Sequence, residues 1–253
     1  MNKLSFVKQL TTVAATATLM TVGMSIARTQ TASAASITNG GFETGDHTGW
    51  TVVKQENSGG DRFITEGTTT QLTGSSIPNP TEGSFFSVTD QGGPGSYVLF
   101  QDIVLESDSS HTLSFDWFAQ DYFNAGVSDA GNMSKDSFPN HHFRVDIVDT
   151  SFTDWFGPSS SAGVLANLIS PTAEAPLVEG FNNATFDLTA FSGSTVRLAF
   201  RNVDNKGFFH AGVDNVQIQS ASIASVPEPT TILGLLALGG AGFVSRRKKQ
   251  AVK

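Results

Sequence analysis

The sequence predicts an all-β fold in which two antiparallel sheets pack as a sandwich. Apolar and polar residues alternate with a period of two in Leu113–Trp117 and Val196–Arg201, as in strands that bury one face. Clusters of Gly, Ser, Asn and Pro separate such segments. No convincing amphipathic helix occurs, although Val164–Ile169 could form one or two helical turns. About nine strands without regular helices between them favour a sandwich over a βαβ fold.

The expected strands follow one another through residues 50–219. In order they are Trp50–Lys54, Arg62–Glu66, Ser84–Thr89, Tyr97–Leu105, Leu113–Trp117, His142–Val148, Ala184–Leu188, Val196–Arg201 and Gly212–Gln219. Two stretches interrupt this rhythm. Residues 119–140 make a connection of 22 residues, longer than the roughly 12 to 15 of an ordinary loop, and we interpret it as a functional loop or a mobile insertion. Residues 159–176, rich in Ser, Ala and Pro, are expected to form a surface excursion.

The N-terminal segment, residues 1–34, has the three parts of a secretory signal peptide. Lys3 and Lys8 precede a stretch of apolar and small residues, Thr11–Ala27. The segment closes with Ala32-Ser33-Ala34, which matches the A-x-A pattern of a cleavage site. Because Thr and Ala dominate the stretch, we favour a cleaved leader over an N-terminal membrane helix. The sequence therefore predicts export.

The last 28 residues, 226–253, combine a Pro-Glu-Pro motif, an apolar run and a basic cluster. The run, Ile232–Val244, has 13 residues, and as a helix it would span about 20 Å. The hydrocarbon core of a bilayer is about 30 Å thick, so this short hydrophobic helix is a marginal span. Cationic residues after it would stay on the cytoplasmic side and leave the preceding chain outside.

These three parts resemble the PEP-CTERM sorting signal. The motif residues are Pro227, Glu228 and Pro229, and the membrane-stop charges are Arg246, Arg247, Lys248 and Lys249. The resemblance implies a Gram-negative bacterium that makes exopolysaccharide and an exosortase-type enzyme that processes the protein near the motif. It also implies transient inner-membrane association through the C-terminal segment, followed by delivery to the cell surface or extracellular matrix. The alternatives are a plain membrane anchor or a chance Pro-Glu-Pro before a helix.

The body between the two signals differs from them in charge. We expect a signal peptide at 1–34, one β-sandwich domain of 191 residues at 35–225, and the sorting signal at 226–253. Eight of the 15 basic and one of the 23 acidic residues lie in the two signals, which leaves the body 7 basic and 22 acidic residues and a net charge of −15. Such a surface repels nucleic acid and attracts divalent cations. No nucleic acid is expected as a partner, and the absence of cysteine excludes disulfides.

Short segments at both ends of the body resemble carbohydrate-binding-module-like jelly rolls. Asn39–Gly45 with Thr48–Trp50 resembles their first strand, and Gly212–Ile218 resembles their last. Leu113–Trp117 resembles a central strand of body domains that recur in PEP-CTERM proteins. The implied fold is a jelly-roll-like sandwich.

The same resemblance implies a structural calcium ion that joins the first strand to the last. Its side-chain ligands would be Glu43 and Asp214, and carboxylates and carbonyls are the ligands that calcium prefers. The alternative is that both carboxylates only accept hydrogen bonds within turns. No other cofactor is expected.

Motifs for catalysis are missing from the sequence. It has no Gly-x-Ser-x-Gly, no Cys nucleophile, no phosphate-binding Gly-x-x-x-x-Gly-Lys and no His-Glu-x-x-His. A Ser-His-Asp set assembled from distant positions stays open. His141 and His142 are adjacent and would point to opposite faces of a strand, so we expect no shared zinc ion and one exposed ring. Asp116 and Asp146 are expected on solvated outer faces rather than as a catalytic pair.

Aromatic residues outside the strand pattern are the candidate ligand platform. Trp50 and Trp117 are expected in the core, whereas Trp155 follows Asp154 in a turn-like segment. Asp121, Tyr122 and Phe123 begin the long connection. Sugars bind exposed aromatic faces beside fixed polar groups, so these five residues are the candidate ligand site. The alternative is that they cap the end of the core.

These observations predict an exported, non-enzymatic surface or exopolysaccharide-matrix protein with polysaccharide as its expected ligand. One alternative is an extracellular glycan-active enzyme, which needs a cleft with two carboxyl groups of separated pKa. The other is a calcium-dependent structural or adhesive matrix protein.

Overall fold

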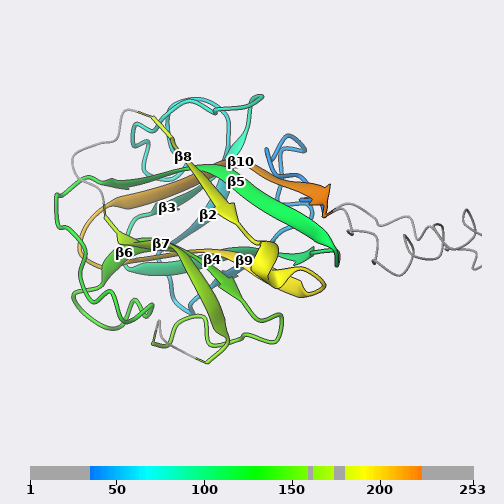
Figure 1. Ribbon diagram of the computed structural model, residues 1–253. Helices are drawn as coiled ribbons and strands as arrows, with labels where there is room; N and C mark the ends of the chain where they lie inside the picture. The colour runs from blue at the N-terminus through cyan, green and yellow to red at the C-terminus, as the bar shows by residue number, and fades with distance from the viewer. Residues whose placement is uncertain (1–34, 159–161, 174–179, 224–253) are drawn as a thin grey trace, which may run out of the picture. The chain divides into compact units, whose positions relative to one another are not determined.

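The chain forms two antiparallel five-stranded sheets that face each other (Figure 1). The computed structural model describes residues 35–158, 162–173 and 180–223, and within them it has ten strands and one short 3₁₀ turn, Thr189–Phe191. The predicted all-β sandwich is confirmed. The leader, the Pro-Glu-Pro motif, the C-terminal apolar segment and the basic cluster lie outside the described residues. In the part of the chain that is described, no helix is long and apolar enough to cross a membrane.

Each sheet mixes early and late strands of the sequence. Sheet A contains, in spatial order, β1 (Thr51–Lys54), β4 (Gly95–Val104), β9 (Thr195–Asp204), β6 (His141–Val148) and β7 (Val164–Thr172). Sheet B contains β2 (Gly60–Thr65), β3 (Phe86–Gln91), β10 (Phe209–Ser222), β5 (Ser109–Asp121) and β8 (Asn182–Asp187). The pairing is antiparallel throughout, with a bulge in β10 between Asp214 and Gln217.

One end of the sandwich collects the connections that pass between the sheets. Gly60 pairs with Gln91, Gly95 pairs with Asp204, and Phe209 pairs with Asp121, so these strand ends meet. The connections 55–59, 92–94, 122–140 and 205–208 therefore leave the sheets at the same end, which we call the crossover end.

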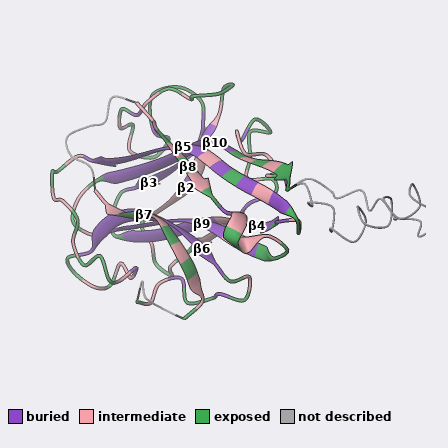
Figure 2. Cartoon of the chain, in the orientation of Figure 1, coloured by how far each residue is buried: buried purple, intermediate pink, exposed green. Residues whose placement is uncertain are grey.

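Aromatic rings fill the space between the sheets. Phe115 of sheet B meets Phe200 of sheet A edge to face, with ring centroids 5.1 Å apart. Trp117 stacks on Phe143 across the same gap at 5.7 Å. Trp50 and Trp117 are both buried, as the sequence predicts. Figure 2 shows buried residues concentrated along the central strands of both sheets.

The outer faces of the sheets are also covered, which the alternating pattern does not predict. Val98 and Ala199 of sheet A pack under Phe152 and Trp155, from the connection after β6. On sheet B, the residues of the β2–β3 connection bring Ile77 onto the outer face of β3 and β5. Because a connection distant in sequence supplies each cover, the burial of the outer face depends on tertiary structure.

This cover corrects two expectations about carboxylates. Asp146 is fully buried, and its oxygens accept hydrogen bonds from Arg144 at 2.7 and 2.8 Å and from Arg201 at 3.0 Å. Asp116 is buried as well and accepts from Asn183 and Asn215. Both were expected to be solvated. The connection that carries Trp155 covers the face with Asp146, whereas Asp116 is enclosed by asparagines of the neighbouring strands β8 and β10.

The segment Val164–Ile169 is a strand and not a helical turn. It belongs to β7, which pairs with β6 through an irregular register, for example Val145 opposite Ile169. A segment of this length forms a helical turn or a strand with similar ease by itself. The neighbouring edge of β6 decides the outcome because it offers unpaired backbone groups.

Candidate ligand site

A cavity of about 190 Å³ lies at the crossover end. Its lining comes from three connections and the end of β9, and consists of Gly92, Gly93, Pro94, Phe123, Asp204, Asn205, Gly207 and Phe208. A Cβ on Gly92 or Gly93 would meet nothing within 4 Å, so the backbone there is open. Pockets for whole drug-sized ligands have about 300 to 1,000 Å³. This cavity suits a small group or one unit of a longer chain.

Two phenylalanine rings form the rim of the cavity. Phe123 is 60% exposed and Phe208 is 39% exposed, and their ring centroids are 5.7 Å apart. Gly207 directly precedes Phe208 and has a φ of 151°, which favours glycine. A Cβ at Gly207 would lie 2.7 Å from Cδ2 of Phe123. Glycine at this position therefore allows the two rings to approach each other.

The long connection that carries Phe123 is held by specific hydrogen bonds. The Asp121 carboxylate accepts from the N–H groups of Phe123 at 3.1 Å and Gly126 at 2.8 Å. Further along, the Asn205 amide donates to the carbonyls of Lys135 at 2.6 Å and Ser137 at 2.8 Å. These contacts place the connection against the β9–β10 connection, so the site combines residues from distant parts of the chain.

A buried polar cluster lies behind the cavity. His141 Nδ1 lies 2.8 Å from Asp204 Oδ1, and His141 Nε2 lies 3.4 Å from Asp121 Oδ1. Gln91 donates to the other oxygen of Asp204. The cluster joins β3, β5, β6 and β9 beneath the connections. Because the imidazole is fully buried and faces two carboxylates, its geometry suits a structural tie more than proton transfer to a ligand.

The neighbouring His142 corrects the expectation that one of the two histidines is exposed. Both rings are buried. The rings occupy opposite faces of β6, and His142 lies under the long connection, with Nε2 3.2 Å from Met133 Sδ. Burial lowers the pKa of His142 to about 4.

The predicted aromatic platform divides between two places. Trp155 is 7% exposed and stacks on Phe100 at 5.1 Å over the outer face of sheet A, in agreement with the core-capping alternative. Asp154 is exposed and belongs to the same connection. Tyr122 is half-buried and donates to the Ser76 carbonyl, and burial raises its pKa. Of the five predicted residues, only Phe123 lines the cavity. Asp121 holds Phe123 in place by accepting a hydrogen bond from its N–H.

The two predicted calcium ligands, Glu43 and Asp214, both accept hydrogen bonds from the segment 81–85. Glu43 accepts hydrogen bonds from the N–H groups of Ser84 and Phe85 at 2.8 to 3.1 Å. Asp214 accepts from the N–H and hydroxyl of Thr81 at 2.8 and 2.9 Å, and burial raises the pKa of Asp214. N–H groups that converge on a carboxylate take the place of a cation. No group of three or more carboxylate or histidine side chains suited to a metal occurs among the described residues.

These contacts agree with the turn interpretation of Glu43 and Asp214. The donors that reach the two carboxylates are backbone N–H and hydroxyl groups, whereas calcium asks for 6 to 8 oxygen ligands. The side chains present therefore do not form a calcium site by themselves. Calcium binding stays a prediction.

Phe208 and the glycines of the cavity were not predicted from the sequence. Gly92-Gly93-Pro94 has the composition of a turn, but nothing in the sequence links this turn to Phe123. Phe208 follows a glycine between two strands, which is the local signal of an exposed turn residue. Their association depends on the crossover end, where strands far apart in sequence finish together.

Residues 225–249 match the model of the PEP-CTERM protein-sorting motif. This chain carries a PEP-CTERM sorting motif. The motif indicates an exported protein that an exosortase processes at the membrane. No curated protein matches the sequence.

Solved structures similar to this PEP-CTERM protein are other β-sandwiches. One is the carbohydrate-binding module TmCBM61, determined with β-1,4-galactotriose, at 11% identity, with 72% of this chain and 96% of that chain covered and a TM-score of 0.45. Another is a cyclase from Fischerella sp. TAU, at 15% identity, 76% and 100% coverage and a TM-score of 0.44. A third is the K3 adhesin domain of Lys-gingipain from Porphyromonas gingivalis W83. It is 16% identical, the match covers 73% of this chain and 98% of that chain, and the TM-score is 0.44. Similarity at this level concerns the fold and not the function.

Proposed function

We propose that this exported protein is a non-enzymatic component of the cell surface or exopolysaccharide matrix that binds one unit of a polysaccharide at the crossover end. The observation that supports this proposal is the exposed Phe123–Phe208 pair at the rim of a cavity with a bare glycine backbone. A sugar ring has one apolar face, which packs on an aromatic ring, and hydroxyl groups at its edge, which bond to peptide groups.

The charge of the body favours a neutral polysaccharide. The body carries 22 acidic and 7 basic residues, and Asp204 lines the cavity. Lys206 is adjacent, but its ammonium group donates to the Ala125 carbonyl at 3.0 Å. A polyanion would therefore meet repulsion with no dedicated cation to offset it. Neutral glucans and galactans are the first ligands to test.

The sorting motif supports the location. After export, the C-terminal segment would associate transiently with the inner membrane, and processing near Pro227, Glu228 and Pro229 would pass the body to the surface or matrix. A protein kept in that layer needs only weak contacts with each polysaccharide unit, because many units lie within reach of one molecule.

The test measures binding of the exported protein to neutral and anionic polysaccharides by affinity electrophoresis. Phe123→Ala and Phe208→Ala are each expected to weaken binding about tenfold, which corresponds to about 1.4 kcal/mol. Phe138→Ala is the matched control, since Phe138 is 76% exposed on the same connection as Phe123 but does not line the cavity.

Three outcomes would contradict the proposal. Neutral polysaccharides fail to bind the native protein, the control variant weakens binding as much as the two rim variants, or anionic polysaccharides bind more tightly than neutral ones. Thermal unfolding of each variant shows whether the fold is retained, so a folding defect is separated from a binding defect.

A further inference from the structure

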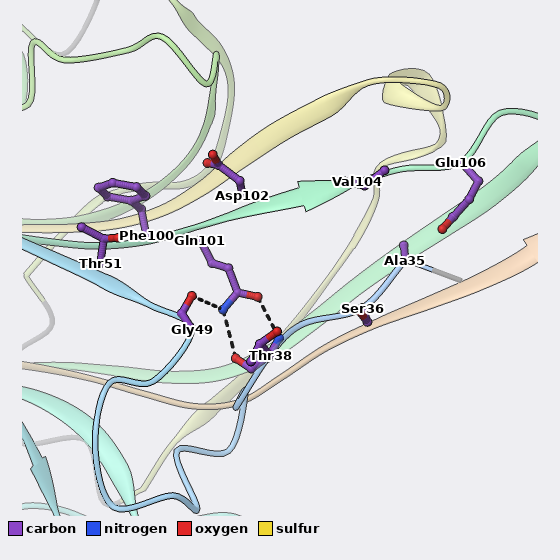
Figure 3. Close-up of a pocket in the computed structure, with 10 residues that line it drawn as sticks. All are labelled: Ala35, Ser36, Thr38, Gly49, Thr51, Phe100, Gln101, Asp102, Val104 and Glu106. Atoms are coloured by element: carbon purple, nitrogen blue, oxygen red, sulfur yellow. Dashed lines mark hydrogen bonds between the residues drawn. The ribbon is translucent and has the colours of Figure 1, made fainter. Parts of the chain in front are cut away.

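A second cavity, of about 520 Å³, lies between β4 and the first described segment of the chain. Figure 3 shows Ala35, Ser36 and Thr38 along one side and Phe100, Gln101, Asp102, Val104 and Glu106 along the other. At one end of the cavity the side chain of Glu106 is directed toward Ala35 (Figure 3).

The segment that begins at Ala35 is fixed in place. The Gln101 amide accepts from the N–H of Thr38 at 2.8 Å and donates to the carbonyls of Thr38 at 3.0 Å and Gly49 at 2.9 Å. Ala35 itself is buried and belongs to the main core between the sheets. The backbone nitrogen of Ala35 is therefore held at the edge of the core, beside the cavity.

Glu106 has a carboxylate without a matching donor. Its side chain is 12% exposed, and within the described residues Oε2 is buried and has no hydrogen-bond partner. His111 Nδ1 lies 3.9 Å away, but Ser220 Oγ lies closer to it, at 2.9 Å, and His111 Nε2 lies 2.9 Å from the Glu106 carbonyl. With the ring proton on Nε2, Nδ1 accepts from Ser220 and offers nothing to Glu106.

The other charges at the cavity leave Glu106 unbalanced. Asp102 also lines the cavity, but Arg197 binds it through two hydrogen bonds of 2.6 and 3.1 Å. Glu106 is partly buried, and a carboxylate whose buried oxygen has lost its hydration without gaining a partner is costly. The cavity therefore presents a negative site that fits one small cation.

We propose that signal-peptide cleavage supplies this cation, and that the new α-ammonium group of Ala35 pairs with Glu106. The predicted cleavage site, Ala32-Ser33-Ala34, ends immediately before Ala35. A signal peptidase adds water across the Ala34–Ala35 peptide bond. The hydroxyl joins the Ala34 carbonyl carbon, and the hydrogen joins the Ala35 nitrogen. The acid then loses its proton, and the amine gains one from solvent. The inference rests on the leader and not on polysaccharide binding.

The pairing would couple processing to stability. In the uncleaved chain the Ala35 nitrogen is an uncharged amide, and the nearest basic atom to Glu106 is His111 Nδ1 at 3.9 Å. After cleavage the ammonium group contributes three donors and a positive charge at the edge of the core. The sandwich would gain part of its stability only after export.

A double-mutant cycle on the exported protein tests the proposal. The variants are Glu106→Gln, an insertion of Gly-Ser between Ala34 and Ala35 that moves the mature amine away, and both changes together. Each single change is expected to lower the Tm by about 2 to 4 °C. In the inserted background, Glu106→Gln should leave the Tm unchanged or raise it, because the unpaired carboxylate is gone.

The pH dependence provides a second readout. An α-amino group has an ordinary pKa of about 7.7 to 8.0, and pairing with Glu106 would raise it in the folded state. The stabilisation is then complete below that range and is lost as the pH rises through the raised pKa of the folded state. The titratable and charged side chains that face the pair are the His111 imidazole, Asp102 and Arg197. Glu106→Gln should remove this alkaline loss.

The proposal is overturned if the two changes lower the Tm additively, or if N-terminal sequencing of the exported protein finds a residue other than Ala35. Both results leave the polysaccharide proposal intact, since that site lies at the crossover end. Equal Tm values for the native protein and for Glu106→Gln at neutral pH would also exclude the pair.

Discussion

Replacing Asp146 by asparagine removes the negative charge from a buried cluster on the outer face of sheet A. The carboxylate binds Arg144 at 2.7 and 2.8 Å, Arg201 at 3.0 Å and the Asn167 amide at 2.9 Å. Arg201 is fully buried, and burial lowers its pKa while Asp146 opposes that shift. Without the carboxylate, two buried guanidinium groups lose their counter-charge.

The expected cost follows from burial. Breaking a buried ion pair by removal of one partner costs about 3 to 5 kcal/mol, which is roughly 6 to 20 °C in Tm for a domain of this size. The matched control is Asp102→Asn. Asp102 also pairs with an arginine, Arg197, on the outer face of the same sheet, but its side chain is 43% exposed. Exposed pairs contribute about 0 to 1 kcal/mol, so the control should change little.

The assay is urea and thermal unfolding of the exported protein, followed by circular dichroism. The reasoning is refuted if Asp146→Asn and Asp102→Asn have equal effects, or if Asp146→Asn costs less than about 1 kcal/mol. Either result would mean that water reaches the Arg201 cluster and that the 149–158 connection does not seal the sheet.

Two further predictions concern pH and calcium. Because the pKa of His142 in the folded state is about 4, below the ordinary 6.5, its contribution to stability is present above pH 6.5 and is lost as the pH falls from 6.5 towards 4. The loss is roughly 3 kcal/mol at most, and His142→Gln should reduce the fall in Tm between these pH values, whereas an unchanged profile would contradict the assignment. Burial also lowers the pKa values of His47 and His210, so part of the fall should remain. The prediction that calcium binds at Glu43 and Asp214 requires millimolar calcium to raise the Tm by mass action and Glu43→Gln to abolish the rise. An identical Tm with calcium and with chelator would remove the calcium interpretation.

The candidate site could be predicted only in part. Phe123 is recognisable because it begins a connection too long for an ordinary loop, and it does line the cavity. Trp155 lies in an equally turn-like segment, yet in the folded chain Phe100 stacks on its ring and the Arg197 guanidinium lies over it. The difference depends on which sheet face each connection crosses, and no local pattern carries that information.

Local chemistry determined most of the strands and the export of this protein. Alternation of side chains along Leu113–Trp117 and Val196–Arg201 follows from the geometry of a strand, and a sorting motif is read as a linear signal, so both are visible without a fold. The tertiary structure decided which outer faces are covered, and so why Asp146 is buried. It also decided that Phe123 and Phe208 lie side by side. The physical reason is that burial and ion pairing depend on neighbours in space, and antiparallel sheets bring together residues that are a hundred positions apart.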